Sequence, residues 1–331
     1  MADVRYNPAM TIPVLDLQSV DAKSLDAACA QWGFFALQGH GIRPALKAEV
    51  LQQCDRFFSQ PRAVKNRIRR SQLNSWGYYD AELTKNQRDW KEILDIGPPA
   101  DQGPLRGSTP QWPALEGFAA SIGEFRDALH DVATQVLEHI VRGLDPDFRA
   151  AGAFENHSSF LRLNYYPPCP APAAANAGFG PDRGFLGISH HTDAGAVTVL
   201  SQDRHAGLQV YQSQRWHLVE PPDDALVINI GDIVQVWSND RYRAPLHRVL
   251  AHTRNARISI PYFLNPDYRC DYAPLPGALA PGATPLYHPI NWGEFRARRS
   301  SGDYTDNGEE VQISDFRRDP SEHERDIDPD S

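Results

Sequence analysis

The chain has 331 residues, of which 41% are hydrophobic, and this length allows one large domain or two ordinary ones with a sizeable core. The formal net charge of −9 and the lack of a long Lys/Arg run argue against nucleic acid or an anionic membrane as the main partner. No apolar run approaches the roughly 18 residues of a membrane span, and the N-terminus shows no apolar signal segment. We therefore expect a cytoplasmic protein with a small-molecule partner, present as a monomer or weak dimer, whose separated cysteines are free thiols.

The first half of the chain has mainly helical patterns. The clearest pattern runs from Leu115 to about Arg142, where apolar residues recur every three or four positions and predict one long helix. The other elements expected before residue 113 are a strand at 12–17, a capped helix from Ser19 or Asp21 to about Trp32, a buried strand at 32–37 and a helix at 44–58.

From residue 158 onward the pattern changes to short strands separated by turns. Many short strands at this spacing are typical of a sandwich or a jelly roll. The expected strands are 160–166, 185–192, 196–201, 207–211, 215–219, 225–230, 233–237, 246–252 and 257–263, with turns at Gly231-Asp232 and at 238–240.

Three residues in this second half form a candidate metal site. His191 and Asp193 are two apart in a strand-like stretch, so alternation places both side chains on one face. His247 follows downstream. Two histidines and one carboxylate, which leave half of the coordination sphere open, form the facial triad of non-haem Fe(II) oxygenases.

Arg257 and Ser259 are the next polar pair, and they are again two apart in a strand-like run. They therefore share a face, where a planar guanidinium and a hydroxyl can act together. Because Arg binds carboxylates in a bidentate manner, this pair suits one end of a dicarboxylate.

Other candidate ligands have weaker support. His190 is adjacent to His191, so strand alternation turns it away from Asp193, either outward or behind the ligands. His40 lies in a glycine-rich turn far from the triad in sequence, which favours a structural histidine that holds its loop by backbone hydrogen bonds. Asp232 also lies in an expected turn, where a structural role is favoured.

These motifs, in this order and spacing, resemble the isopenicillin N synthase-like branch of the Fe(II)/2-oxoglutarate-dependent dioxygenases. The similarity extends to the N-terminal region and covers about residues 12 to 300. The segments that carry it are Ile12–Leu17, Gly33–Phe35, His40–Ile42, Asn164–Cys169, His191–Asp193, His247–Val249 and Arg257–Ser259.

The resemblance implies a mainly β fold with helices, in which a distorted double-stranded β-helix, or jelly roll, occupies residues 156–300. Residues 1–155 would form a helical N-terminal region that packs on this core and includes the long helix. Residues 301–331 are rich in acidic side chains and are expected to be a disordered tail. An Ala/Pro/Gly-rich insertion at 171–183 is expected to be a flexible surface loop, acting as a lid or simply tolerated.

The resemblance also implies the cofactors and the reaction. Fe(II) would be held by His191, Asp193 and His247, with 2-oxoglutarate as cosubstrate, O₂ as oxidant and ascorbate as a candidate reductant. Asn164 and Tyr166 would line the cosubstrate site with Arg257 and Ser259. The expected reaction is oxidation, in the first place hydroxylation, of a small, partly hydrophobic molecule coupled to decarboxylation of 2-oxoglutarate to succinate and CO₂.

Two alternatives stay open on the sequence. One is an iron-dependent oxidase or cyclase of the isopenicillin N synthase type, which uses no 2-oxo acid. The other is a jelly-roll binding module without enzymatic activity.

The substrate pocket is expected to be partly aromatic. Phe263, Trp237 and Tyr79 are its predicted wall residues, together with the region near Trp292. The segments 75–79 and 89–92 resemble the part of the family that lies over the mouth of the site, although core packing explains their aromatic residues equally well.

Overall fold

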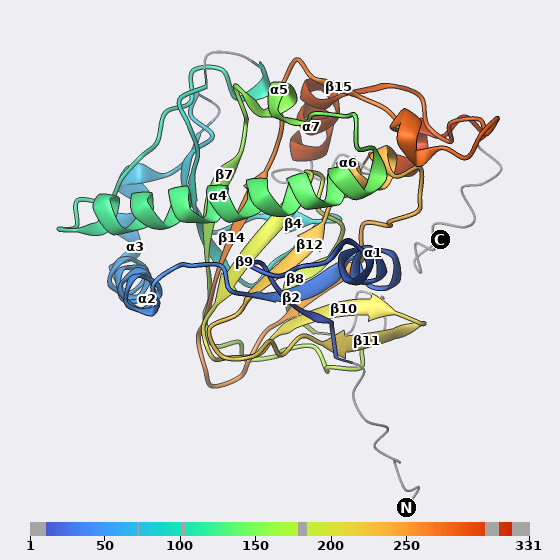
Figure 1. The fold of residues 1–331 in the computed structure, drawn as a ribbon. Coiled ribbons are helices and arrows are strands. Elements are labelled where there is room, and N and C mark those ends of the chain that lie inside the picture. The colour runs from blue at the N-terminus through green and yellow to red at the C-terminus, as the bar shows by residue number, and fades with distance from the viewer. Residues whose placement is uncertain (1–10, 72, 101–102, 178–183, 302–310, 320–331) are drawn as a thin grey trace, which may run out of the picture.

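The computed structural model describes residues 11–319 apart from 72, 101–102, 178–183 and 302–310, and the chain forms two main β-sheets with helices packed over the larger one (Figure 1). The larger sheet has eight strands in the order β1-β2-β12-β9-β14-β7-β6-β3. Its outer strands are β1 (Val14–Asp16), β2 (Phe34–Gln38), β6 (Glu92–Ile96) and β3 (Gly77–Tyr79), and its central strands are β12 (Leu226–Ile230), β9 (Val197–Gln202), β14 (Arg257–Leu264) and β7 (Phe160–Tyr166). The predicted N-terminal region is therefore not only helical, because it supplies the four outer strands.

The smaller sheet has four antiparallel strands in the order β11-β10-β13-β8. Their bounds are β11 (Arg215–Leu218), β10 (Leu208–Gln212), β13 (His247–Leu250) and β8 (Leu186–His191). Side chains from both sheets, such as Phe34 and Val227 from the larger and Val210 and Val249 from the smaller, form one buried cluster. Two sheets facing each other across a shared core confirm the predicted jelly roll.

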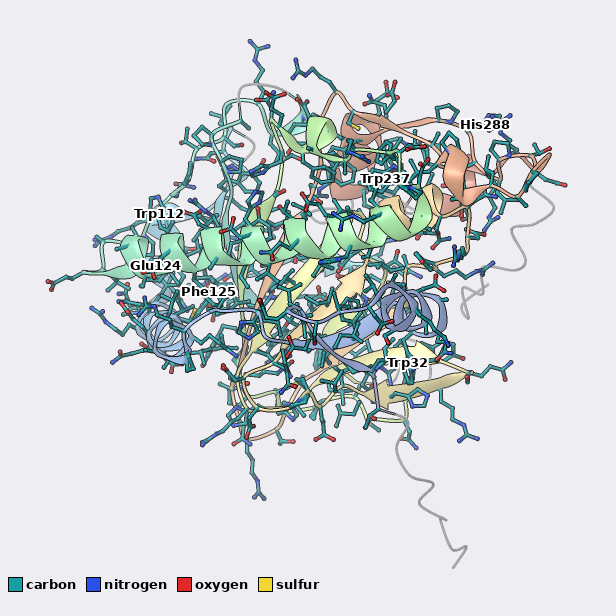
Figure 2. All side chains as sticks on the ribbon, viewed as in Figure 1. Trp32, Trp112, Glu124, Phe125, Trp237 and His288 are labelled. Carbon is teal, nitrogen blue, oxygen red and sulfur yellow. The ribbon has the colours of Figure 1, made fainter. Side chains whose placement is uncertain are left out.

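The long helix α4 (Phe118–Leu144) crosses the outer face of the larger sheet in Figure 1. Its apolar positions recur at three and four residues, and Phe125, Leu129 and Ile140 on this face are at most 2% exposed. Glu124, the neighbour of Phe125, has a side chain that is 56% exposed, so the two residues labelled in Figure 2 mark an exposed and a buried side of the helix. This burial confirms the helix as a support for the sheet.

Two further helices pack beside α4, and both were predicted. Helix α1 (Ala22–Gln31) begins at Asp21, whose carboxylate accepts the backbone N–H of Ser24 at 2.9 Å. Helix α2 (Pro44–Phe58) has its proline in the first turn, where the missing N–H costs nothing. None of the described helices is long and apolar enough to cross a membrane. The shorter elements are α3 (Arg62–Lys65), η1 (Asn66–Ile68), β4 (Leu83–Thr84), β5 (Gln87–Arg88), η2 (Gly103–Leu105), α5 (Ala151–Phe154), α6 (Asp232–Trp237), β15 (Asp271–Tyr272), η4 (Pro276–Ala278), β16 (Ile290–Asn291), α7 (Trp292–Ser301) and η5 (Ile313–Phe316).

One predicted strand is wrong. Residues 233–237 belong to the helix α6, and Gly231-Asp232 begins this helix instead of forming a turn. All six residues of α6 are buried, so the apolar run has no periodicity that separates a helix from a strand. A Cβ on Gly231 would lie 2.2 Å from the backbone oxygen of Gly195, which explains why a glycine precedes the helix.

Parts of the predicted C-terminal tail and of the 171–183 insertion make defined contacts with the rest of the chain. Within the expected tail, 302–310 and 320–331 lie outside the described residues, but Val311 and Ile313 are buried and Arg317 pairs with Asp240. The disorder prediction is therefore wrong for 311–319. In the insertion, 178–183 lie outside the described residues, whereas the side chain of Arg248 donates to the backbone oxygens at 175 and 177.

Candidate active site

A cavity of about 1140 Å³, including its open mouth, lies between the two sheets and α7. It brings together all seven residues predicted for the metal and cosubstrate sites: His191, Asp193, His247, Arg257, Ser259, Tyr166 and Asn164. They come from β7, β8, β13 and β14 and from the loop after β8, so residues up to 95 positions apart in the chain meet at one place.

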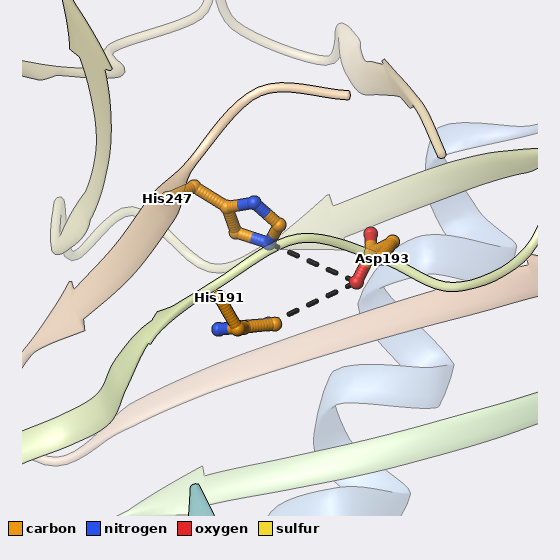
Figure 3. A group of neighbouring side chains, drawn as sticks. All are labelled: His191, Asp193 and His247. Carbon is orange, nitrogen blue, oxygen red and sulfur yellow. Dashed lines mark ion pairs between the residues drawn. The ribbon is translucent and has the colours of Figure 1, made fainter. Parts of the chain in front are cut away.

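The three candidate metal ligands converge where β8 ends at His191 and the neighbouring strand β13 begins at His247, with Asp193 in the loop after β8 (Figure 3). His247 and His191 are paired across β13 and β8, and the Nε2 atom of each ring is 3.8 Å from Oδ1 of Asp193. The three ligand atoms all lie within 4.8 Å of one another. This spacing lets one metal ion reach all three, and the donor set of two imidazoles and a carboxylate suits Fe(II).

Asp193 reaches this position by a route that differs from the prediction. Strand β8 ends at His191, so Asp193 lies in the following loop and does not share a face by strand alternation. The backbone oxygen of Asp193 accepts the N–H of Asp232 at 2.8 Å, which ties the loop to the first turn of α6. A loop anchored to a helix start, rather than a strand face, therefore aims the carboxylate.

Backbone carbonyls fix the orientation of both imidazoles. Nδ1 of His191 is 2.8 Å from the oxygen of Ser189, and Nδ1 of His247 is 3.0 Å from the oxygen of Pro245. A carbonyl oxygen only accepts, so Nδ1 carries the proton and the lone pair of Nε2 faces the ligand site. Burial lowers the pKa of His191 to about 3, so its ring is neutral at physiological pH.

The second oxygen of Asp193 is held by two polar residues that sequence reasoning missed. Oδ2 accepts hydrogen bonds from Thr198 at 2.5 Å and from Asn229 at 2.7 Å, which leaves Oδ1 for a metal. Burial alone would raise the pKa of Asp193, but the nearby His247 and His191 and these two hydrogen bonds lower it. The available signal was Asn229, a polar residue inside the otherwise apolar strand β12; Thr198 gave no such signal, because β9 also contains Ser201 and Gln202.

The cosubstrate residues lie on two paired strands. The register of β14 with β7 sets Arg257 opposite Tyr166 and Ser259 opposite Asn164. The Ser259 hydroxyl is 3.2 Å from the Tyr166 hydroxyl and 3.3 Å from the Asn164 amide nitrogen. A cluster of donors of this kind can bind a carboxylate.

Arg257 supplies the charge of this cluster. It is 1% exposed, and its Nε and Nη2 donate to the backbone oxygen of His205 at 3.0 Å and to Gln202 at 2.7 Å. Nη1 is buried and has no hydrogen-bond partner among the described residues. Since a buried guanidinium donor is costly to leave unsatisfied, this atom fits an anionic ligand that enters the cavity.

The predicted substrate residues divide into two groups. Phe263 and Trp292 line the cavity, whereas Trp237 and Tyr79 do not belong to its described lining. Trp237 packs in the core against Phe148 and Phe154, above α4 in Figure 2. The prediction for Trp237 is wrong because its apolar run forms the buried helix α6 and not a strand that lines the cavity.

The prediction for Tyr79 is wrong for a different reason. Tyr79 lies on the edge strand β3, with the guanidinium carbons of Arg69 and Arg70 at 4.8 and 4.3 Å from the centre of its ring. The 75–79 segment therefore packs away from the cavity. The 89–92 segment instead supplies Lys91, which lines the cavity.

A buried ionic network borders the cavity, and sequence reasoning did not predict it. Lys91 lies 2.7 Å from Glu82 and 2.9 Å from Asp89, and Glu82 also pairs with Arg162 at 2.9 Å. Asp89 additionally accepts the backbone N–H of Ser189 at 3.0 Å, on the metal strand β8. The network thus fixes the position of β8 relative to the segment around Lys91.

Neither His190 nor His40 belongs to the metal site, as predicted, but His190 is more buried than expected. His190 is 2% exposed and is not part of the described cavity lining, so it is buried and does not face outward. His40 bonds to the backbone oxygen of Asp224 at 2.8 Å and accepts the N–H of Ile42 at 3.1 Å, which confirms its structural role.

Comparison with known proteins agrees with this geometry. The model of the 2OG-Fe(II) oxygenase superfamily matches residues 157–266, and that of the non-haem dioxygenase in morphine synthesis N-terminal region matches residues 12–115. Gibberellin 2-beta-dioxygenase 2 of Arabidopsis thaliana is 31% identical, over 89% of this chain and 86% of its own.

Solved structures of proteins with bound 2-oxoglutarate are also similar to this chain. A full-length Neurospora crassa protein in complex with alpha-KG has a TM-score of 0.74 at 27% identity, covering 88% of this chain and 96% of that one. JOX2 in complex with 2OG, Fe and JA has a TM-score of 0.74 at 29% identity, covering 87% and 85%. The chain belongs to the 2OG-Fe(II) oxygenase superfamily. It is a 2-oxoglutarate-dependent Fe(II) dioxygenase that oxidises a small organic molecule, with O₂ as oxidant and with decarboxylation of 2-oxoglutarate to succinate and CO₂.

Proposed function

We propose that His191, Asp193 and His247 hold the Fe(II) and that the cluster around Arg257 binds 2-oxoglutarate. Bound Fe(II) supplies the activation of O₂ that couples decarboxylation to oxidation of the substrate. The observation that carries the proposal is the presence, in one cavity, of a three-ligand cluster and a buried Nη1 of Arg257 that has no hydrogen-bond partner among the described residues.

In this proposal the protein binds the two ends of 2-oxoglutarate differently. The distal carboxylate accepts from Nη1 of Arg257 and from the hydroxyls of Ser259 and Tyr166, while Asn164 orients Ser259 by its amide. The 2-oxo acid end then points toward the triad. Thr198 and Asn229 hold Asp193 so that one carboxylate oxygen stays directed at the metal.

The remaining space would take the primary substrate. Its apolar walls include Leu83, Phe160, Phe263 and Trp292, which suits a medium-sized, partly hydrophobic molecule. Hydroxylation of a C–H bond is the reaction proposed for it. The free cysteines suit a reducing, cytoplasmic location, and a monomer or weak dimer is part of the same proposal.

The test uses the full chain in the absence of O₂. Adding Fe(II) and 2-oxoglutarate should produce a weak visible charge-transfer band, and His191→Ala should abolish both the band and tight Fe(II) binding. On admission of O₂, succinate should form in a substrate-dependent manner. Consumption of O₂ without any succinate would instead identify an oxidase that uses no 2-oxo acid, and absence of the band in iron-loaded protein would reject the proposal.

A further inference from the structure

One face of α7 forms a wall of the cavity. Trp292, Arg296 and Arg299 are spaced by four and three residues, so they lie on the same side of the helix, and all three line the cavity. Trp292 is fully buried, and its ring nitrogen donates to the Ser158 hydroxyl at 2.8 Å. Arg299 donates to the backbone oxygen of Thr192 at 3.2 Å, between two of the metal ligands. The wall is therefore fixed at both ends, with Arg296 between them.

Arg296 differs from the other cations around the cavity. Its side chain is half-buried, and it makes no hydrogen bond or ion pair with any residue that the structure describes. Lys91 and Arg162, in contrast, pair with buried carboxylates, and Arg257 donates to His205 and Gln202. A charge that lines a cavity without a protein partner is available to a ligand.

No carboxylate among the described residues pairs with Arg296. The buried network holds equal numbers of cations and carboxylates, namely Arg70, Lys91 and Arg162 with Glu82, Asp89 and Asp95. The two positive charges of Fe(II) offset the two negative charges of 2-oxoglutarate, and Asp193 offsets Arg257. Neither the cofactors nor the network therefore supplies an anion for Arg296.

We infer that the primary substrate carries a carboxylate and that Arg296 binds it, an inference that rests on the proposed function. A planar guanidinium matches the geometry of a carboxylate, and a charge-assisted hydrogen bond is strong in a partly buried site. The apolar body of the acid would lie against Trp292 and Phe263, the aromatic residues of the same cavity. Arg296 thereby selects for hydrophobic monocarboxylic acids over their neutral analogues.

The experiment compares acids with their primary amides, which have nearly the same shape and no charge. The probes are cinnamate, 1-naphthylacetate and decanoate, each with its amide. Binding to the full chain is measured by calorimetry without O₂, in the presence of Fe(II) and saturating 2-oxoglutarate so that Arg257 is occupied. We expect at least one acid to bind about 10- to 100-fold more tightly than its amide.

Variants assign this preference to one side chain. Arg296→Gln should reduce the ratio of acid to amide affinity to about one, and Arg296→Lys should keep part of it because the charge remains. Arg298→Gln is the matched control, because Arg298 lies on the same helix but is outside the described cavity lining. It should keep the wild-type ratio. Thermal unfolding of each variant, compared with the wild type, checks that the fold is retained.

Three results would overturn the inference: equal binding of acids and amides by the wild type, an acid preference that survives Arg296→Gln, or no binding of any acid by protein that does bind 2-oxoglutarate. Failure of the proposed function has a different signature, which is loss of 2-oxoglutarate binding itself. In that case the same acid and amide pairs are measured without cosubstrate, and dependence on Arg296 still decides the inference.

Discussion

Replacement of Arg257 by Leu tests the proposed cosubstrate site most directly. The side chain is 1% exposed, and its Nη1 is the donor that has no hydrogen-bond partner in the described part of the chain. Truncating one member of a buried, hydrogen-bonded charge pair costs about 2–5 kcal/mol of binding free energy. Taking about 3 kcal/mol, and about 1.4 kcal/mol per factor of ten, the affinity for 2-oxoglutarate should fall by about a hundredfold.

The assay is an anaerobic titration of Fe(II)-loaded protein with 2-oxoglutarate, followed by the visible charge-transfer band. Iron affinity, measured separately by competition with a chelator, should stay the same, because the described hydrogen bonds of Arg257 do not reach the triad. Ser259→Ala is the milder comparison: it removes a neutral hydrogen bond worth about 0.5–1.5 kcal/mol, so the affinity should fall by about tenfold or less.

The variant also leaves the oxygens of His205 and Gln202 without their donor, so its unfolding free energy in urea must be measured beside the wild type. Arg257→Lys keeps the charge and controls for this loss. If folded Arg257→Leu protein binds 2-oxoglutarate within about threefold of the wild type, the carboxylate is held elsewhere and the assignment of the cluster is wrong.

Three further predictions concern residues around the site. Thr198→Val removes one hydrogen bond to Asp193 and should weaken iron binding by about tenfold or more in a chelator competition; unchanged affinity would show that this contact does not orient the ligand. Lys91→Met leaves the buried carboxylate of Asp89 without its cation and should lower the unfolding free energy by about 3–5 kcal/mol, whereas Arg43→Ala at an exposed ion pair should lower it by less than about 1 kcal/mol; equal losses in urea would contradict the burial argument. His190→Ala should retain iron binding, because β8 turns this ring away from the triad; its loss would reverse the ligand assignment on this strand.

The strand pattern could be predicted from sequence because the strands are short apolar or alternating runs separated by turn residues. Beyond residue 158 every predicted strand is present except 233–237. The exception is a short, fully buried apolar run without periodicity, and such a run in a helix cannot be told by its pattern from a fully buried strand such as β12. The same loss of periodicity led to the misplacement of Trp237.

The metal and cosubstrate residues could be found because their chemistry restricts which residue types can serve. His191, His247 and Arg257 stand in short motifs, and the cavity does contain them. The roles of their supports were missed, because Thr198 and Asn229 act on Asp193 through hydrogen bonds from two different strands to a loop, and Asn229 lies 36 residues away in the chain. Such contacts depend on strand register, which no local pattern contains.

The ionic network was missed for a related reason. Lys91 and Glu82 are charged residues that usually mark a solvated surface, and only tertiary pairing makes their burial possible. Arg296 is the same kind of case, since a charged residue on a C-terminal helix gives no sign that it faces a cavity. The role of such residues can be recognised only from the tertiary structure around them.

The order of strands in the larger sheet also governs how this protein is made. Strand β2 is synthesised early, yet its partner β12 follows after roughly 190 residues, a delay on the order of ten seconds or more during translation. Until then the apolar strand around Phe34 and Phe35 has an unpaired edge, which favours aggregation and binding by chaperones. His247 is made later still. The emerging chain therefore cannot assemble its iron site, and no oxidising centre forms before most of the sheet is in place.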